Sequence, residues 1–343
     1  MKEIDLMIRI TNRCNLECKM CRFRESSKIP RIDLSFSQIK RLVSGVTSRF
    51  FIRNLTLTGG EPFLNPEIEK IYKYLAAQCK NNKIRRLKLS TNGYLTKKVI
   101  QFLTQNKSSI SNLFLHFSLD GPLKVHNLIR GKDDAYQKTD LTINKIRLLF
   151  PELNLGVGFT ITPANYQHIE YVYEYCLKRN IQFFPDIMVI TDFGVDLSRT
   201  LTKRNKDLKS VFSKVKVKLP EIEQIYTRNQ RSQIIKCLSA ILKQEVKEKN
   251  RIVQLSELVR VIKLISHGKS IIKSCKLPMY FLLVRESGDI FPCPYMWNLP
   301  IANLNQENFE KQIFGKLHLN IIKRGLKLNC PKCFGNCGYL ELE

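Results

Sequence analysis

The stretch Thr11–Phe23, TNRCNLECKMCRF, directly follows an apolar segment, Leu6–Ile10, that has the composition of a β-strand. It contains three cysteines in the spacing C-x3-C-x2-C, which are Cys14, Cys18 and Cys21. Thiolates are soft ligands, and closely spaced cysteines on a tight loop suit an iron–sulfur cluster or zinc. Structural zinc prefers four protein ligands, and no fourth lies nearby in the sequence. The triplet therefore favours a cluster, in which three thiolates would leave one iron free for a substrate or cofactor.

Four further motifs follow β-rich segments in order along the chain. Each lies just beyond an apolar run, where α/β barrels and open α/β sheets place their functional loops. They are Thr58–Pro62 (TGGEP), Ser90–Gly93 (STNG), Ser118–Gly121 (SLDG) and His126–Gly131 (HNLIRG). One such motif alone would mean little because glycines mark turns everywhere. Four of them in register behind the cysteine triplet form a specific pattern.

Together, the triplet and the four motifs resemble the signature of the radical S-adenosylmethionine (radical SAM) superfamily over residues 5 to about 190. The resemblance implies an α/β fold, an open partial (β/α)6 barrel, with a 4Fe–4S cluster held by Cys14, Cys18 and Cys21. The free iron of that cluster would chelate the amino and carboxylate groups of S-adenosylmethionine. One low-potential electron would then release a 5′-deoxyadenosyl radical, so the protein's own task is binding, orientation and exclusion of water.

The resemblance also implies a set of residues that contact S-adenosylmethionine. These residues are Met20, Gly59, Gly60, Glu61, Ser90, Asn92, Ser118, Asp120 and Arg130. Gly59 and Gly60 would let the backbone approach the methionine end, while Glu61 would accept from the ammonium group or order its loop. Arg130 would offer a bidentate fork to the carboxylate. An ordinary loop salt bridge is the alternative for Glu61 and Arg130, and Met20 stands where the family usually carries an aromatic residue.

From Asp5 to about Thr191, short β-rich runs alternate with helical stretches. Such repeated units predict parallel strands joined by right-handed crossovers. The predicted strands are 6–10, 54–58, 86–90, 112–118, 154–161 and 182–190, and the predicted helices between them are 35–48, 66–80, 96–105, 140–149 and 165–179. Ser35, Asn65 and Thr96 are predicted N-caps. Farther along, 203–218, 230–249 and 255–266 are predicted as helices.

A second set of cysteines follows His267. It consists of Cys275, Cys293, Cys330, Cys333 and Cys337. Residues 280–293 are typical of a β-hairpin with Gly288 at its turn, which would bring Cys275 and Cys293 toward one place. On spacing alone, a 4Fe–4S cluster and zinc held by four thiolates are both consistent with this set.

The second set resembles the SPASM/twitch extension of radical SAM enzymes, because C-x12-G-x4-C is followed by a C-x2-C knuckle. The resemblance implies an auxiliary 4Fe–4S cluster held by Cys275, Cys293, Cys330 and Cys333, with Cys337 replacing one of these or staying unused. The chain ends six residues after Cys337, so we expect the shorter twitch form. The predicted domains are a barrel over 1–215, a helical connecting region over 216–268 and an auxiliary cluster domain over 269–343.

The net charge and the number of cysteines indicate the kind of partner and the cellular compartment. The chain has 57 basic and 30 acidic residues, a net charge of +27, which favours an anionic partner or reflects a genome rich in lysine codons. No apolar run is long enough to span a membrane and no signal peptide is visible, so eleven cysteines indicate a reducing, cytoplasmic location. Single cysteines within helices, such as Cys176, are predicted to be buried apolar residues. His116 is predicted to face the barrel interior, and His126 and His318 to lie at the surface or in loops.

The leading functional prediction is a radical SAM oxidoreductase or maturase that abstracts hydrogen from a ribosomal peptide or a sugar-like small molecule. Its auxiliary cluster would transfer an electron or brace a lid over the substrate. Its expected partners are a low-potential electron donor such as flavodoxin or ferredoxin and, without an N-terminal leader-binding domain, a separate leader-binding protein. Two alternatives stay open, an RNA- or tRNA-modifying radical SAM enzyme and a non-catalytic zinc-bearing scaffold.

Overall fold

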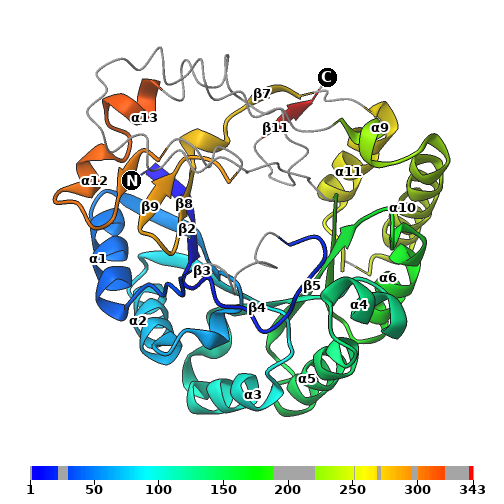
Figure 1. The fold of residues 1–343 in the computed structure, drawn as a ribbon, viewed down its shortest axis with the longest axis horizontal. Helices are drawn as coiled ribbons and strands as arrows, with labels where there is room; N and C mark the ends of the chain where they lie inside the picture. Colours follow the sequence, from blue (N-terminus) through cyan, green and yellow to red (C-terminus); the bar gives the residue numbers. More distant parts are fainter. Residues whose placement is uncertain are drawn as a thin grey trace.

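The computed structural model describes residues 2–21, 30–187, 221–250, 252–268, 272–294, 300–320 and 340–342. Six parallel strands follow one another in sequence order across a curved sheet, and helices cover the outer side of that sheet (Figure 1). The strands are β1 (Lys2–Arg9), β2 (Phe50–Thr58), β3 (Ile84–Thr91), β4 (Leu113–Ser118), β5 (Asn154–Ile161) and β6 (Gln182–Ile187). The predicted partial (β/α)6 barrel is confirmed.

The barrel helices lie between these strands and bury one face each. They are α1 (Phe36–Thr47), α2 (Ile68–Lys80), α3 (Thr96–Gln105), α4 (Leu123–Arg130), α5 (Ala135–Leu149) and α6 (Ile169–Lys178). In α1, the buried residues Ile39, Leu42, Val43 and Val46 recur at the spacing of one helix face. The sequence predicted neither α4 nor the first turn of α5. The glycine at residue 131 ends α4, and α5 begins after the short loop that follows.

One of the three predicted N-caps is correct. Ser35 closes a capping box with Gln38 at the start of α1. Asn65 is not the cap of α2, because residues Pro62–Leu64 form a 3-10 turn and the helix begins only at Ile68. Its side chain instead donates to the carbonyl oxygens of residues 10 and 34. Thr96 is the first residue of α3 rather than its cap.

The two faces of the sheet differ in chemistry. Leu87 and Leu89 of β3 and Leu115 of β4 are buried against the helices, so they form the outer, core-facing side. Lys88, Ser90, Phe114 and His116 alternate with them, are half-buried and occupy the inner face of the barrel. Ser90 and His116 are paired in register on that inner face, as predicted for His116.

Three helices come next after β6 in the described chain, and two of them pack beside α6 and β6. They are α9 (Ile222–Ile225), α10 (Arg228–Glu248) and α11 (Leu255–His267), and α10 packs on both α6 and α11. The predicted helices 230–249 and 255–266 are therefore confirmed within a residue or two. The predicted helix 203–218 lies outside the described residues.

The predicted C-terminal hairpin is present as β8 (Phe281–Val284) and β9 (Asp289–Phe291), with Gly288 at a φ of 86° in its turn. β8 pairs in parallel with β1, so that within the described residues the barrel sheet continues through β8, β9 and one further short strand. A buried ion pair, Arg9 to Glu286 at 3.1 Å, also links β1 to the hairpin turn. The domain boundaries themselves stay a prediction.

Short elements complete the described C-terminal part. They are β10 (Ala302–Asn303), α12 (Phe309–Gln312), α13 (Lys316–Asn320) and an antiparallel pair formed by β7 (Ile272–Cys275) and β11 (Leu340–Leu342). His318 of α13 is buried, contrary to the prediction, because its ring bridges the backbone of residues 278 and 314.

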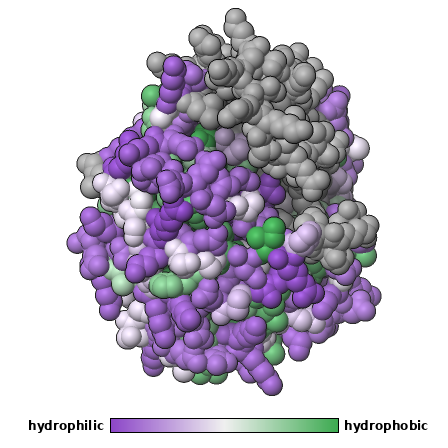
Figure 2. Space-filling model, turned by 60° about the vertical axis from the view of Figure 1, so that its left-hand side comes forward, coloured by the Kyte–Doolittle hydropathy of each residue, from purple (hydrophilic) through white to green (hydrophobic). Residues whose placement is uncertain are grey.

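The surface matches the charged composition. Among the described residues on the face shown in Figure 2, most are hydrophilic, and the apolar ones form small scattered groups. Among the described residues, none of the helices has the length and apolar character needed to cross a membrane.

Candidate active site

The cysteine loop after β1 is clamped at its base by the segment that precedes α1. The Asn12 side chain donates to the carbonyl oxygen of Pro30 at 2.8 Å and accepts from the amide of Ile32 at 2.9 Å. Arg13 forms an ion pair with Asp33 at 2.6 Å. These contacts fix where the chain leaves the strand and turns toward Cys14.

Gly59 and Gly60 follow β2 and pack directly against the backbone of the same loop. The amide of Gly60 donates to the carbonyl oxygen of Thr11 at 2.9 Å. A Cβ on Gly60 would lie 2.1 Å from the carbonyl oxygen of Arg13, and one on Gly59 would lie 2.5 Å from that of Thr11. The glycines are required here because the loop backbone occupies that space. Their predicted contact with the methionine end of S-adenosylmethionine stays a prediction.

The far side of the loop docks on the C-terminal end of α4. The amides of Glu17 and Lys19 donate to the carbonyl oxygens of Arg130 and Ile129 at 3.2 and 2.8 Å. These carbonyls are among the last in the helix and lack partners within it. Gly131 ends the helix at a φ of 72°, and a Cβ there would lie 2.6 Å from the carbonyl oxygen of Glu17. The HNLIRG motif therefore shapes the loop through its backbone.

The three cysteines share one small apolar cluster with Leu16, Tyr94 and a residue of α5. Cys14 and Cys21 are half-buried, whereas Cys18 is only 6% exposed. Burial, together with the charges of Glu61, Cys18 and Cys21, raises the pKa of Cys14 to about 11. Three thiolates crowded here would repel one another, so a bound cationic centre is needed to hold them ionised.

Two polar side chains point at the sulfurs. The Asn92 amide nitrogen lies 3.9 Å from Cys14 Sγ, and Arg130 Nη1 lies 3.7 Å from Cys18 Sγ. Such outer donors orient metal-bound ligands and tune the metal centre. Across the residues that the structure describes, no three His, Cys, Asp or Glu side chains converge tightly enough for one metal ion. A 4Fe–4S cluster does not need that convergence because each thiolate binds a different iron, so the donor set fits a cluster.

Glu61 is fully buried and orders the loops around it. Its carboxylate accepts from the hydroxyl of Thr91 at 2.9 Å and from the amides of Asn92 and Phe63 at 2.8 and 3.3 Å. Burial raises the pKa of Glu61 to about 7, although these three hydrogen bonds oppose the shift. Of its two predicted roles, the structure displays loop ordering. Thr91 was missed by the sequence reasoning although it lies inside the STNG motif.

We expect Glu61→Gln to destabilise the anaerobically prepared protein by about 1–3 kcal/mol, because the amide nitrogen would face a buried donor. The pH dependence has a definite sign, since the native pKa of Glu61 is raised and the folded state binds the extra proton. The wild-type advantage over the variant should be complete below about pH 4.5 and should shrink as the pH rises through 7. Urea denaturation of both proteins at pH 5 and pH 8 measures this difference, and equal differences at both pH values would contradict the account.

Asn92 ties the end of β3 to the cysteine loop. Its Nδ2 atom donates to the side-chain oxygen of Asn15 at 2.9 Å, and its Oδ1 atom accepts from the amide of Tyr94 at 2.9 Å. The predicted contacts Ser90 and Ser118 lie half-buried on the inner face, at the carboxyl ends of β3 and β4. Met20 lies half-buried in the turn before the third cysteine. The site residues thus gather at one end of the sheet.

Asp120 and Arg130 form the ordinary salt bridge that the sequence left as an alternative. Asp120 Oδ2 lies 2.6 Å from Arg130 Nε, and the aspartate is fully buried. The backbone amide of Asp120 donates to His126 Nδ1 at 3.0 Å. The surface prediction for His126 is therefore wrong, because this ring packs inside the loop that holds Asp120. The predicted roles of Asp120 and Arg130 toward S-adenosylmethionine stay predictions.

Only part of the second cysteine set can be placed. Cys293 is buried, and Cys275 ends strand β7. Cys330, Cys333 and Cys337 lie outside the described residues. The backbone of Cys275 pairs with that of Leu340, three residues beyond Cys337 in the chain. This pairing places Cys275 beside the strand that follows the knuckle, and the ligand set of the auxiliary cluster stays a prediction.

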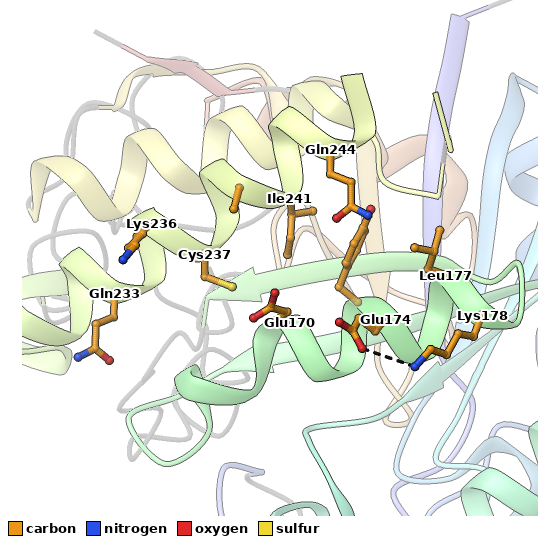
Figure 3. Close-up of a pocket in the computed structure, with 11 residues that line it drawn as sticks. Glu170, Glu174, Leu177, Lys178, Gln233, Lys236, Cys237, Ile241 and Gln244 are labelled. Atoms are coloured by element: carbon orange, nitrogen blue, oxygen red, sulfur yellow. Dashed lines mark ion pairs between the residues drawn. The ribbon is translucent and has the colours of Figure 1, made fainter. Parts of the chain in front are cut away.

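A separate cavity of about 620 Å³ lies between α6 and α10, on the helix layer (Figure 3). Cys237 and Gln244 enter it from α10, opposite Glu170 and the ion pair of Glu174 with Lys178 at 3.6 Å. It contains none of the residues predicted to bind the cluster or the cofactor.

Comparison with known proteins identifies related sequences. The family model described as the radical SAM superfamily matches residues 8–176. GTP 3′,8-cyclase from Nitrobacter winogradskyi is 28% identical over 159 residues, which cover 43% of this chain and 45% of the cyclase. AdoMet-dependent heme synthase from Methanosarcina barkeri is 23% identical over 325 residues, covering 90% of this chain and 82% of the synthase.

Among solved structures, anSMEcpe with bound AdoMet and the Cp18Cys peptide has a TM-score of 0.65 and 19% sequence identity. The alignment covers the whole of this chain and 93% of anSMEcpe. At this identity the likeness concerns the fold. The matched part of this chain extends past the barrel.

Proposed function

Because residues 8–176 belong to the radical SAM superfamily, we propose that this protein cleaves S-adenosylmethionine reductively and uses the product radical to abstract hydrogen from a substrate. The observation that carries the proposal is the cysteine loop, held between Gly60 and the end of α4 with a charged donor at Cys18. Members of this family use a 4Fe–4S cluster and S-adenosylmethionine. A bound cluster would supply the electron that splits the sulfonium carbon–sulfur bond, giving methionine and a 5′-deoxyadenosyl radical.

The protein's own residues would bind the cluster and orient S-adenosylmethionine on it. Cys14, Cys18 and Cys21 would hold three irons, and the fourth would stay open to the amino and carboxylate groups of S-adenosylmethionine. Ser90 and Ser118, at the strand ends beside the loop, would bond the ribose or the carboxylate. Asn92 and Arg130 would orient the cysteine sulfurs through the contacts described above.

We propose a peptide as the substrate, with the protein acting as a maturase. The support is the likeness over the whole chain to anSMEcpe, which binds a peptide in its solved structure. An auxiliary cluster on the second cysteine set would accept the electron left on the substrate after hydrogen abstraction. A small redox protein of low potential would supply the first electron, and a separate protein would bind any leader sequence.

The experiment is elemental analysis of protein purified without oxygen, followed by incubation with S-adenosylmethionine and dithionite. We expect about eight irons and eight sulfides per chain, for two 4Fe–4S clusters, and 5′-deoxyadenosine that forms only with the reductant. Protein incubated without dithionite is the control. Zinc in place of iron, with no 5′-deoxyadenosine, would support the scaffold alternative and contradict the proposal.

A further inference from the structure

Lys88 is a cationic side chain on the inner face of the barrel that the proposed function has not used. It lies on β3, two residues before Ser90 and therefore on the same face. In register, it is flanked by Thr56 of β2 and Phe114 of β4. Its side chain is half-buried, so solvent reaches it although protein surrounds most of it.

The rings of two phenylalanines lie next to the Lys88 side chain. Its Nζ atom lies 5.3 Å from the ring centre of Phe114 and 5.0 Å from that of Phe184. The two rings meet edge to face with centres 5.9 Å apart. Gly156 on β5 makes room for them, because a Cβ there would lie 2.6 Å from Phe114 and 2.7 Å from Phe184. Three neighbouring strands, β4, β5 and β6, therefore contribute to this aromatic contact.

Within the described part of the chain, Lys88 makes no hydrogen bond and no ion pair. Two inward carboxylates of the described strands have other partners, since Asp5 pairs with Arg53 at 2.7 Å and Asp186 interacts with Arg260. Burial lowers the pKa of Lys88 to about 8, because the charged ammonium group loses hydration. An anion beside Lys88 would supply the missing compensation.

His116 of β4 lies on the same inner face, close to these rings. Its ring centre lies 5.4 Å from that of Phe184, and a Cβ on Gly158 would lie 2.6 Å from the ring. Burial and the charge of Lys88 hold the pKa of His116 well below its ordinary value, so the ring is neutral. A neutral imidazole has one N–H to donate and adds no second positive charge. The pair thus offers one cation and one neutral donor.

We propose that Lys88 and His116 form an anion-binding subsite for the substrate, which takes a carboxylate or a phosphate group. The inference rests on the proposed function in that the substrate occupies the same inner face as Ser90 and Ser118. For a peptide, the carboxylate of an acidic side chain would fill the subsite. For a phosphorylated substrate, a phosphate would. In either case, the anion would lie beside the Lys88 ammonium group and the His116 ring and would fix which hydrogen faces the cofactor end of the barrel.

The test uses the full chain, purified anaerobically and carrying ¹³C at the ε-carbon of lysine. Titration by NMR should reveal one lysine resonance with a pKa of about 8, and its absence from Lys88→Arg assigns it. Sodium glutarate and sodium pyrophosphate are the two probes, one for each anion. We expect at least one probe to shift the resonance saturably and to raise its pKa by about one unit, a tenfold preference for the charged lysine.

Calorimetry then measures how the same probe binds to three variants. Lys88→Met should lose saturable binding and Lys88→Arg should keep it, while Lys97→Met, which removes an exposed lysine of α3, should bind like the wild type. A shift with glutarate alone indicates a carboxylate substrate, and one with pyrophosphate alone indicates a phosphate. If neither probe moves the resonance in the wild type, the inference is overturned whether or not the variants fold. Anion binding by protein that makes no 5′-deoxyadenosine would instead overturn only the proposed function.

Discussion

Cys18→Ala is expected to abolish reductant-dependent 5′-deoxyadenosine formation and to remove about half of the iron, four atoms of the eight in two clusters. Cys18 is the most buried of the three cysteines and the one that Arg130 contacts. Two thiolates would remain, and they could not retain a cluster that needs three protein ligands to keep its open iron. Iron analysis and chromatography of the reaction products measure the two effects.

The matched control is Cys176→Ala, which removes a fully buried thiol from α6, away from the cysteine loop. This variant should keep its full iron content and its S-adenosylmethionine cleavage. It should lose only about 1 kcal/mol of stability from the small cavity left behind. If Cys18→Ala still produces 5′-deoxyadenosine at the wild-type rate, the assignment of the primary site is wrong.

Asp120→Ala is expected to lower the free energy of unfolding by about 3–5 kcal/mol, because it leaves the Arg130 guanidinium buried without its partner. The same change should reduce the iron content, since Arg130 would no longer be oriented toward Cys18 and its helix end supports residues 17–19 of the loop. Urea denaturation under anaerobic conditions measures the stability, and iron analysis of the same preparation measures the second effect.

The control for this substitution is an exposed ion pair of similar geometry. Glu3→Ala breaks the contact with Arg85, which is 2.7 Å long, against 2.6 Å for the buried pair, but lies at the surface. It should cost less than about 1 kcal/mol. In the double variant Asp120→Ala with Arg130→Met, much of the lost stability should return because no charge stays buried and unpaired. Equal costs for Asp120→Ala and Glu3→Ala would show that burial of the pair does not matter.

Much of the barrel could be predicted from the sequence because the information is local. Short β-rich runs alternate with helical stretches, and the motifs TGGEP, STNG and SLDG begin at the ends of β2, β3 and β4. Parallel strands place their carboxyl ends at one edge, so the order of the motifs along the chain becomes proximity in space. The cysteine triplet could be assigned for the same reason, since its three residues lie within one short loop.

Other features depend on contacts between distant segments and have no local signal. Gly60 is explained by the backbone of Arg13, and the pairing of β8 with β1 joins residues far apart in the chain. Asp120 and Arg130 satisfy each other across a loop and a helix, which residue type alone could not distinguish from cofactor binding. Lys88 was overlooked because a lysine in a strand usually faces solvent, although its two-residue spacing from Ser90 placed it on the inner face.

The most direct test of the central claim is electron–nuclear double resonance on the reduced N-terminal cluster. The sample would carry serine at Cys275 and Cys293, so that the auxiliary site does not interfere, and S-adenosylmethionine labelled with ¹⁷O in the carboxylate and ¹⁵N in the amino group. We expect hyperfine coupling from both labels, because one iron of the cluster lacks a protein ligand and binds these groups. A cluster that shows no coupling to either label, or that retains four protein ligands, would contradict this account.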